Sequence, residues 1–179
     1  MPVKLNNYDL SKHVIILTGA TDGIIVQNQI IKTKDNFELQ FQVNHLAPFL
    51  LTLLLLDTMK KSVSAELPGK IALTSSEANK FGEIDFDNLN LEKGSYLNPF
   101  QAYGNTKLMN VLVTKELSRI VQNESAINVL YPVFSHENKE TGKYYKDGVE
   151  EPNKVAYDQE VAKKLWDVSE KILKNHGMI

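Results

Sequence analysis

Apolar residues along the chain fall into short unbroken runs and into longer stretches in which they recur every three or four positions. Three runs rich in Val, Ile and Leu are bounded by turn-forming residues and predict buried strands. They read HVIILT, KIALTS and AINVLYPV and cover residues 13–18, 70–75 and 126–133. Residues 141–148 are expected to add a short fourth strand, and the polar segment 77–98 is expected to be a loop.

The longer stretches have the spacing of helices. They cover residues 35–59, 100–121 and 157–173. Asp35 and Glu38 resemble a capping box at the start of the first helix, whereas Pro48 should kink or divide it. Asp158 is expected to cap the last helix. Strands that alternate with helices favour an α/β fold with a parallel sheet, in which sites form at the carboxyl ends of the strands.

Length and composition favour a single domain, because 179 residues with 42% apolar content suffice for one core. A net charge of −2 without a basic stripe argues against nucleic acid as a partner. The chain has no cysteine, and its first residues lack the apolar centre of a signal peptide, so a cytoplasmic location is favoured. The apolar run 46–59 is too short for a membrane span and contains Pro48 and Asp57, so a core helix is expected. No metal site is expected, since His45 has no second ligand at a suitable spacing.

A tyrosine precedes a lysine by four residues in the sequence FQAYGNTKLMN. On a helix, Tyr103 and Lys107 would share a face, and a nearby ammonium favours phenolate, which makes tyrosine usable as an acid or base near neutrality. The alternative is that Tyr103 only packs its ring while Lys107 is solvated, and spacing alone favours this alternative. Tyr8 and Lys12 have the same spacing but lie before the first strand without a helix signal.

Polar residues and glycines follow or interrupt the apolar segments. Ser75 and Ser76 end the second strand and could bind a carbonyl or alkoxide, although serines at such positions also form turns. Asn44 is an amide in a largely apolar helix and needs a partner, either a water or a backbone group. Gly19 and Gly23 follow the first strand and permit close approach of a pyrophosphate, a weak signal when taken alone.

Taken together and in order, these segments resemble the short-chain dehydrogenase/reductase family. The motifs are TGATDGI, VNHLAPFLLTLLLL, GKIALTSSEA, AYGNTKLMNVL and INVLYP. The segment containing IDFDNLN and the tail TGKYYKDG…YDQEVAKKLWDVSEKIL resemble the branch of retinol dehydrogenases and the WW-domain-containing oxidoreductase. The resemblance implies a Rossmann-like, doubly wound parallel sheet and an oxidoreductase that uses NADP or NAD on a lipophilic alcohol or carbonyl.

The resemblance also implies roles for individual residues. Tyr103 would donate or accept the proton, and Lys107 would favour its phenolate and hold the nicotinamide ribose. Ser76, rather than Ser75, would position the substrate oxygen, and Asn44 would hold the water of a proton relay. The cofactor-binding positions would be Thr18, Gly19, Gly23, Ile24, Tyr103 and Lys107.

The chain departs from the family pattern in two places. Only 20 residues separate Gly23 from Asn44, whereas one βα unit takes roughly 30 residues. Strands two to four of the family therefore do not fit, and Ile25 stands where the family has its third glycine. The substrate lid that follows the VLYP strand in the family is also missing. Cofactor binding is expected to be impaired, and the helix 35–59 should expose an apolar surface that favours self-association.

Two functions therefore remain open for residues 1–179, taken as one truncated domain of this type. The first is an oxidoreductase by descent. The second is an inactive form or pseudoenzyme that acts through binding or has no independent function. An unrelated nucleotide-binding module is disfavoured, because the chain has no Gly-Lys-Ser/Thr phosphate loop.

Overall fold

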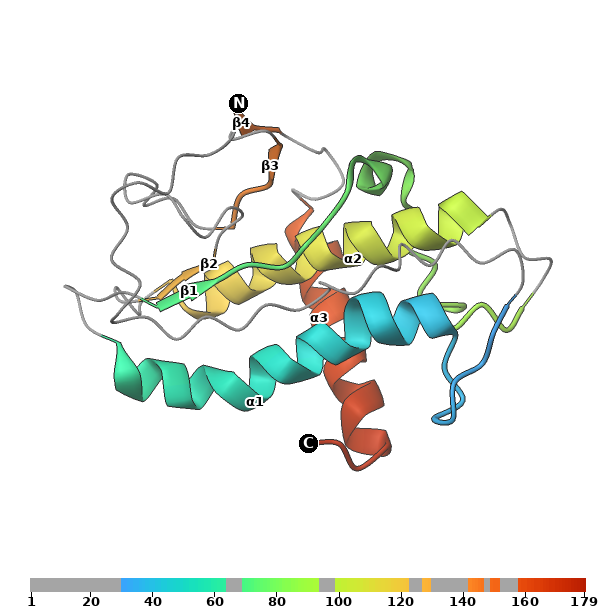
Figure 1. The fold of residues 1–179 in the computed structure, drawn as a ribbon, viewed down its shortest axis with the longest axis horizontal. Helices are drawn as coiled ribbons and strands as arrows, with labels where there is room; N and C mark the ends of the chain where they lie inside the picture. Colours follow the sequence, from blue (N-terminus) through green and yellow to red (C-terminus); the bar gives the residue numbers. More distant parts are fainter. Residues whose placement is uncertain are drawn as a thin grey trace, which may run out of the picture.

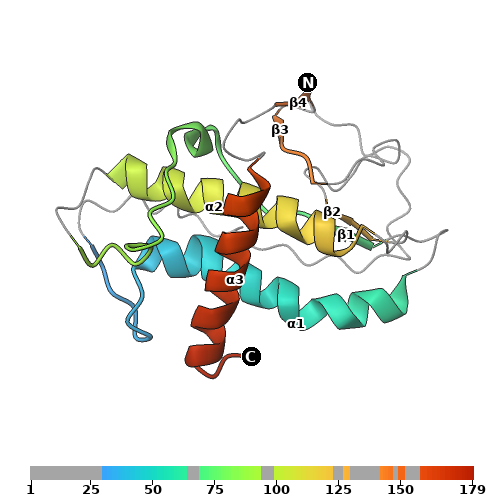
Figure 2. The same ribbon diagram turned by 180° about the vertical axis from the view of Figure 1, so that it is seen from behind.

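Three helices form the frame of the computed structural model (Figure 1). The model describes residues 30–63, 69–93, 99–122, 127–129, 142–146, 149–151 and 158–179. Helices α1 (Ala47–Ser62) and α2 (Pro99–Ile120) run side by side along the long axis. Helix α3 (Gln159–Asn175) crosses them on the face that Figure 2 brings to the front. The predicted strand at residues 13–18 and the glycines after it lie outside the described residues.

Two short parallel strands lie beside one end of the helices. Strand β1 (Gly69–Ile71) pairs in parallel with β2 (Ile127–Val129), with Gly69 opposite Ile127. Helix α2 joins them, so the predicted strand–helix–strand order with parallel pairing is confirmed for this pair. Strand β1 is shorter than predicted, because residues 72–75 have no pairing strand among the described residues.

A separate hairpin contains the predicted fourth strand. Strands β3 (Tyr145–Lys146) and β4 (Val149–Glu150) pair antiparallel with each other. The strand predicted at residues 141–148 is therefore present over two residues, but it belongs to its own two-stranded sheet.

The first long helix begins differently from its prediction. The Glu38 carboxylate accepts a hydrogen bond of 2.7 Å from the backbone N–H of Phe41, while Asp35 accepts from the Gln42 side chain. The predicted capping box is therefore wrong, because the N–H of Glu38 donates to the Asn90 side chain and not to Asp35. A π-helix, η2 (Phe41–Leu46), precedes α1, and Pro48 lies in the first turn of α1. The predicted break at Pro48 thus takes the form of a change of helix type, at a position where proline needs no N–H partner.

Helix α2 lies at the centre of the core. Its apolar side chains at Leu108, Leu112 and Leu117 are fully buried, as the spacing predicted. Six of its polar side chains are buried as well, because η2, η3, α3 and β2 pack around it. They are Thr106, Lys107, Asn110, Thr114, Glu116 and Ser118. Helix α3 closes one side with residues spaced three or four apart. They are Ala162, Leu165, Trp166, Ser169 and Leu173.

Two caps and a short helix complete the frame. The Asp158 carboxylate accepts hydrogen bonds from the N–H groups of Glu160 and Val161, which confirms the predicted cap of α3. The predicted loop 77–98 begins instead with a 3₁₀ helix, η3 (Glu77–Phe81), which packs against α2. Its cap is Ser76, so the end of the β1 segment and the start of η3 meet at that serine.

Candidate active site

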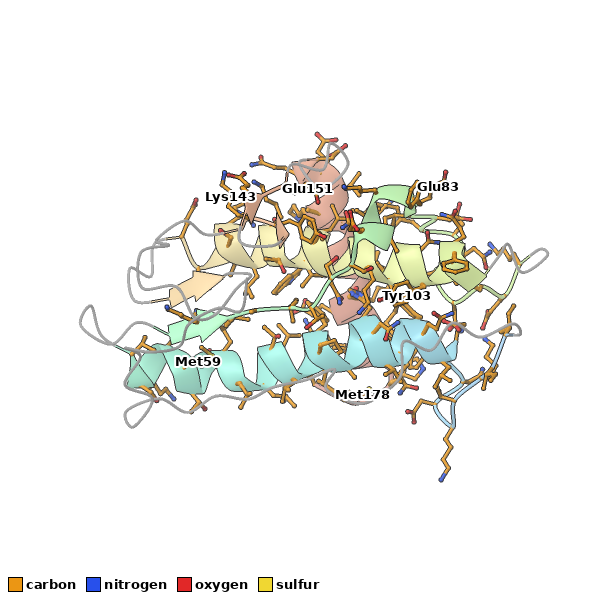
Figure 3. All side chains as sticks on the ribbon, turned by 45° about the horizontal axis from the view of Figure 1, so that its top comes forward. Met59, Glu83, Tyr103, Lys143, Glu151 and Met178 are labelled. Atoms are coloured by element: carbon orange, nitrogen blue, oxygen red, sulfur yellow. The ribbon has the colours of Figure 1, made fainter. Side chains whose placement is uncertain are left out.

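A polar stripe on α2 brings the predicted tyrosine and lysine together. Tyr103, Thr106, Lys107 and Asn110 follow the spacing i, i+3, i+4, i+7 and share one face of the helix. All four side chains are buried, with at most 9% of their surface exposed. The Lys107 ammonium lies 5.3 Å from the centroid of the Tyr103 ring, and Figure 3 labels Tyr103 among its neighbours. A solvated Lys107, the alternative from spacing alone, does not fit this burial.

Lys107 is a partly desolvated cation. Burial lowers the pKa of its ammonium group, because the charged form loses contact with water. Its Nζ donates a long hydrogen bond of 3.4 Å to the Thr74 carbonyl, and it has no ion pair with the described acidic residues. The ammonium therefore keeps donors for another acceptor, such as a hydroxyl group of a bound molecule.

The two adjacent serines have different roles. The Ser75 hydroxyl donates to the Lys107 carbonyl at 2.9 Å and ties the strand end to α2. The Ser76 Oγ accepts from the Ala78 N–H at 3.3 Å, which uses a lone pair and not its hydrogen. Its hydroxyl hydrogen has no acceptor within the described part of the chain, so Ser76 is the serine that can donate to a substrate oxygen.

Asn44 lies within the π-helix η2, half-buried and facing α2. Its side-chain amide donates to the Thr106 hydroxyl at 3.2 Å, and that hydroxyl donates in turn to the Tyr103 carbonyl at 2.8 Å. Its backbone carbonyl accepts from the Asn110 side chain at 2.9 Å. The sequence predicted a water or a backbone group as the partner of this side-chain amide, whereas the partner that the structure describes is the side-chain hydroxyl of Thr106. Single π turns often mark functional sites.

His45, the neighbour of Asn44, is fully buried. Its Nε2 lies 2.9 Å from the Ser169 hydroxyl of α3, and its ring stacks between Phe41 and Phe49. Burial lowers the pKa of His45 to about 4, an effect that the Asn110 side chain partly opposes. The imidazole is therefore neutral near pH 7 and has a structural contact. Within the ranges that the structure describes, no group of three His, Asp or Glu side chains could hold a metal ion.

Two glycines let η3 approach α2 closely beside the tyrosine. A Cβ at Gly104 would lie 2.7 Å from the Ala78 carbonyl oxygen, and a Cβ at Gly82 would lie 2.6 Å from the Gly104 carbonyl oxygen. Both distances are shorter than side chains tolerate. Glycine next to Tyr103 is thus what allows the helix capped by Ser76 to sit directly on α2.

Four of the predicted site residues lie together in one region around α2, and four others lie outside the residues that the structure describes. Asn44, Ser76, Tyr103 and Lys107 all lie on α2 or on segments hydrogen-bonded to it. The predicted phosphate contacts lie outside the described residues. They are Thr18, Gly19, Gly23 and Ile24.

The sequence reasoning missed two residues of this region, Thr106 and Asn110. Both connect α2 to Asn44, and Asn110 also reaches the Thr74 carbonyl. Their signal was present, because they continue the spacing of Tyr103 and Lys107 along the same face of the helix.

Comparisons with known proteins show which proteins this chain resembles in sequence and structure. It is 35% identical to human "Retinol dehydrogenase 14" over 191 aligned positions and 50% identical to human "Retinol dehydrogenase 13" over 101, which cover 82% and 56% of this chain. The chain belongs to the short-chain dehydrogenase/reductase family, in its retinol dehydrogenase-like branch. A solved structure, a putative uncharacterized protein from Mycobacterium paratuberculosis, superposes with a TM-score of 0.65 at 26% identity. The superposition covers 85% of this chain and 64% of that protein. No family model matches the chain.

The chain spans about half the length of the first of these relatives, 55%, and its alignment with the second covers 29% of that protein. The first alignment has 191 positions but uses 82% of 179 residues, about 147. About 44 positions therefore have no counterpart in this chain, which agrees with internal segments that are missing. As for the membrane, none of the helices described is at once long and apolar enough to cross one.

Proposed function

We propose that the chain is, by descent, an NAD(P)-dependent oxidoreductase that interconverts a lipophilic alcohol and its carbonyl compound. The observation that carries this proposal is the buried pair of Tyr103 and Lys107 on α2, beside the strand end that leads to Ser76. The names of the relatives support a retinoid-like alcohol as the substrate class. The motifs support the same assignment, since they occur in the order of the family.

Each residue has a defined task in the proposed reaction. Tyr103 Oη takes the proton of the alcohol or returns it to the carbonyl oxygen. The Lys107 ammonium places its positive charge beside the Tyr103 ring, 5.3 Å from the ring centroid. Ser76 donates its hydroxyl hydrogen to the substrate oxygen and so orients it. Asn44 orders the water through which the proton reaches solvent, as in the family.

The residues described fit one end of a nicotinamide cofactor. Lys107 has donors to spare and lies on the same helix face as Tyr103, so it would hold the ribose hydroxyls. The cofactor, when bound, supplies the acceptor or donor of hydride. The phosphate contacts are proposed at Thr18, Gly19, Gly23 and Ile24 on the motif TGATDGI alone. We also propose that the missing segments weaken binding of both NADP and NAD.

The overall architecture is proposed from the same relationship. The parallel pair β1 and β2 supports a Rossmann-like, doubly wound sheet in a single domain of residues 1–179. The alignment, with about 44 positions unmatched, supports a sheet that is incomplete relative to the family. The exposed side chains of Val43 and Leu54, at 45% and 58%, support self-association through η2 and α1. Sedimentation at several protein concentrations measures it, and a monomer at all of them contradicts this part.

The unmatched positions also favour a second candidate function. A chain without the adenosine half of the cofactor site would be an inactive form or pseudoenzyme that acts through binding, or a form without independent function. Retention of Asn44, Ser76, Tyr103 and Lys107 favours the enzyme, whereas the missing segments favour the inactive form.

A thermal melt with and without excess NADPH or NADH decides between them, because a ligand that binds only the folded state raises the midpoint. A cooperative melt that shifts upward, together with turnover of retinol that is lost in Tyr103→Phe, supports the enzyme. The matched control is Tyr144→Phe, which lies outside the α2 stripe and should keep wild-type turnover. A cooperative melt without shift and without turnover contradicts the enzyme.

A further inference from the structure

Three segments far apart in the chain meet at the side chain of Asn110. The Nδ2 nitrogen lies 2.9 Å from the carbonyl oxygen of Asn44 and 3.0 Å from the carbonyl oxygen of Thr74. The first belongs to η2, the second to the segment that continues β1, and Asn110 itself to α2. The side chain is 4% exposed, so these hydrogen bonds have little competition from water.

The orientation of the amide follows from its partners. Two carbonyl oxygens can only accept, so the NH₂ group must face them and both of its hydrogens are used. The amide oxygen then points away from both carbonyls.

The other polar contacts of α2 each reach only one of the two segments. Thr106 reaches Asn44, whereas Lys107 reaches Thr74 and Ser75 reaches α2 through the Lys107 carbonyl. Among the hydrogen bonds of the described residues, Asn110 is the side chain on α2 that reaches both. Without the two donors of Asn110, the segments that carry these two carbonyls would be held to α2 only by weaker or indirect contacts.

We propose that Asn110 is a positioning residue that holds the π turn of Asn44 and the strand end before Ser76 in a fixed relation to Tyr103. The inference rests on the proposed function, since the segments it joins are those that carry Asn44, Ser76 and Tyr103. It acts through backbone carbonyls and touches neither substrate nor cofactor. An amide is suited to this role because its nitrogen offers two diverging donors, whereas serine or threonine at this position would offer one.

The wild-type protein provides a test that needs neither turnover nor a variant. Both side-chain amide hydrogens of Asn110 should exchange with solvent far more slowly than those of the exposed Asn175, as read from side-chain amide signals in NMR spectra. Slow exchange of both hydrogens supports the bridge, by which we mean the two hydrogen bonds from the Asn110 side chain to the carbonyls of Asn44 and Thr74. Exchange of either one at the rate of Asn175 overturns it.

Variants then test the consequence for the site. Asn110→Leu and Asn110→Asp keep the approximate shape but cannot donate to either carbonyl. The matched control is Thr114→Val, which removes a buried hydrogen bond of 2.8 Å that stays within α2. We expect backbone exchange over residues 41–46 and 69–76 to speed up at least about tenfold in the Asn110 variants and to stay unchanged in the control.

Kinetics separate positioning from general stability. With rates normalised to the folded fraction, the Asn110 variants should lose kcat at least about tenfold while KM for the cofactor changes less than about twofold. Equal kcat in Asn110→Leu and Thr114→Val overturns the positioning role. If wild-type protein shows no turnover while both amide hydrogens are protected, the proposed function fails and the bridge stands. Turnover with unprotected hydrogens refutes the bridge alone.

Discussion

The buried imidazole of His45 should make stability depend on pH in a predictable direction. Burial lowers its folded-state pKa from the ordinary value of 6.5 to about 4. The unfolded chain therefore binds a proton more readily than the folded chain between these two values. The stability that the neutral ring permits is fully present above pH 6.5 and is lost as pH falls toward 4.

The magnitude follows from the difference between the two pKa values. A shift of one unit corresponds to about 1.4 kcal/mol, so the difference of about 2.5 units predicts a loss of about 3 kcal/mol in the free energy of unfolding. This is a large share of the roughly 5–15 kcal/mol that stabilises an ordinary domain. The effect should therefore be measurable well above the error of a denaturation experiment.

Urea denaturation at several pH values between about 4 and 8 tests the prediction. Carboxylates also titrate over this range, so the comparison is the difference between wild type and His45→Gln. Glutamine keeps an amide nitrogen near the place of the imidazole Nε2 and does not titrate, which preserves the contact with Ser169. Wild type should lose about 3 kcal/mol more than the variant between pH 6.5 and 4. Equal slopes for the two proteins would refute the reasoning, because the ring would then titrate alike in both states.

Three further predictions concern the stability of the fold, and two of them include a control substitution. Gly82→Ala should lower the free energy of unfolding by about 1–3 kcal/mol in urea denaturation, since the added Cβ would lie 2.6 Å from the Gly104 carbonyl oxygen. The φ of Gly82 is −71°, which suits any residue, so the expected loss is steric. Wild-type stability of the variant would show that η3 does not lie this close to α2. Leu112→Ala should cost about 2–5 kcal/mol because the side chain is fully buried, whereas Leu54→Ala, 58% exposed, should change stability by less than about 0.5 kcal/mol; a similar loss in both would contradict the assigned burial. Asp158→Ala should lower the unfolding free energy by about 1 kcal/mol through loss of the α3 cap, whereas Asp158→Asn should keep most of the wild-type stability. Equal stability of Asp158→Ala and wild type in urea denaturation would show that the cap contributes nothing.

Local rules account for the parts of the fold that were predicted correctly. Periodicity located α2 and α3 to within about two residues, and Asp158 caps α3 as its residue type suggests. Apolar runs located β1 and β2 and their parallel pairing. These features depend on residues that are close in sequence or on the alternation of strand and helix.

The features that were missed depend on contacts between distant segments. The π-helix η2 has no sequence signal of its own, and it is the Glu38 carboxylate, not that of Asp35, that accepts from a backbone N–H at its start. The candidate site shows the same division. The Tyr103–Lys107 pair was visible from spacing and resemblance, but the partners of Asn44 were not, because they lie 62 and 66 residues further along the chain.

The position of α3 has a consequence for synthesis of the protein on the ribosome. Helix α3 follows all the segments that it covers, and its Trp166 ring packs edge-on against Phe49 of α1 at 4.8 Å between ring centroids. During translation, at roughly 5–20 residues per second, η2, α1 and α2 leave the ribosome while the surface that α3 covers is still open to water. Buried rings such as Phe49 and His45 are then accessible to chaperones or to neighbouring nascent chains. The core can close only when the segment Gln159–Asn175 has emerged, so the helical frame cannot finish folding before α3 has been synthesised.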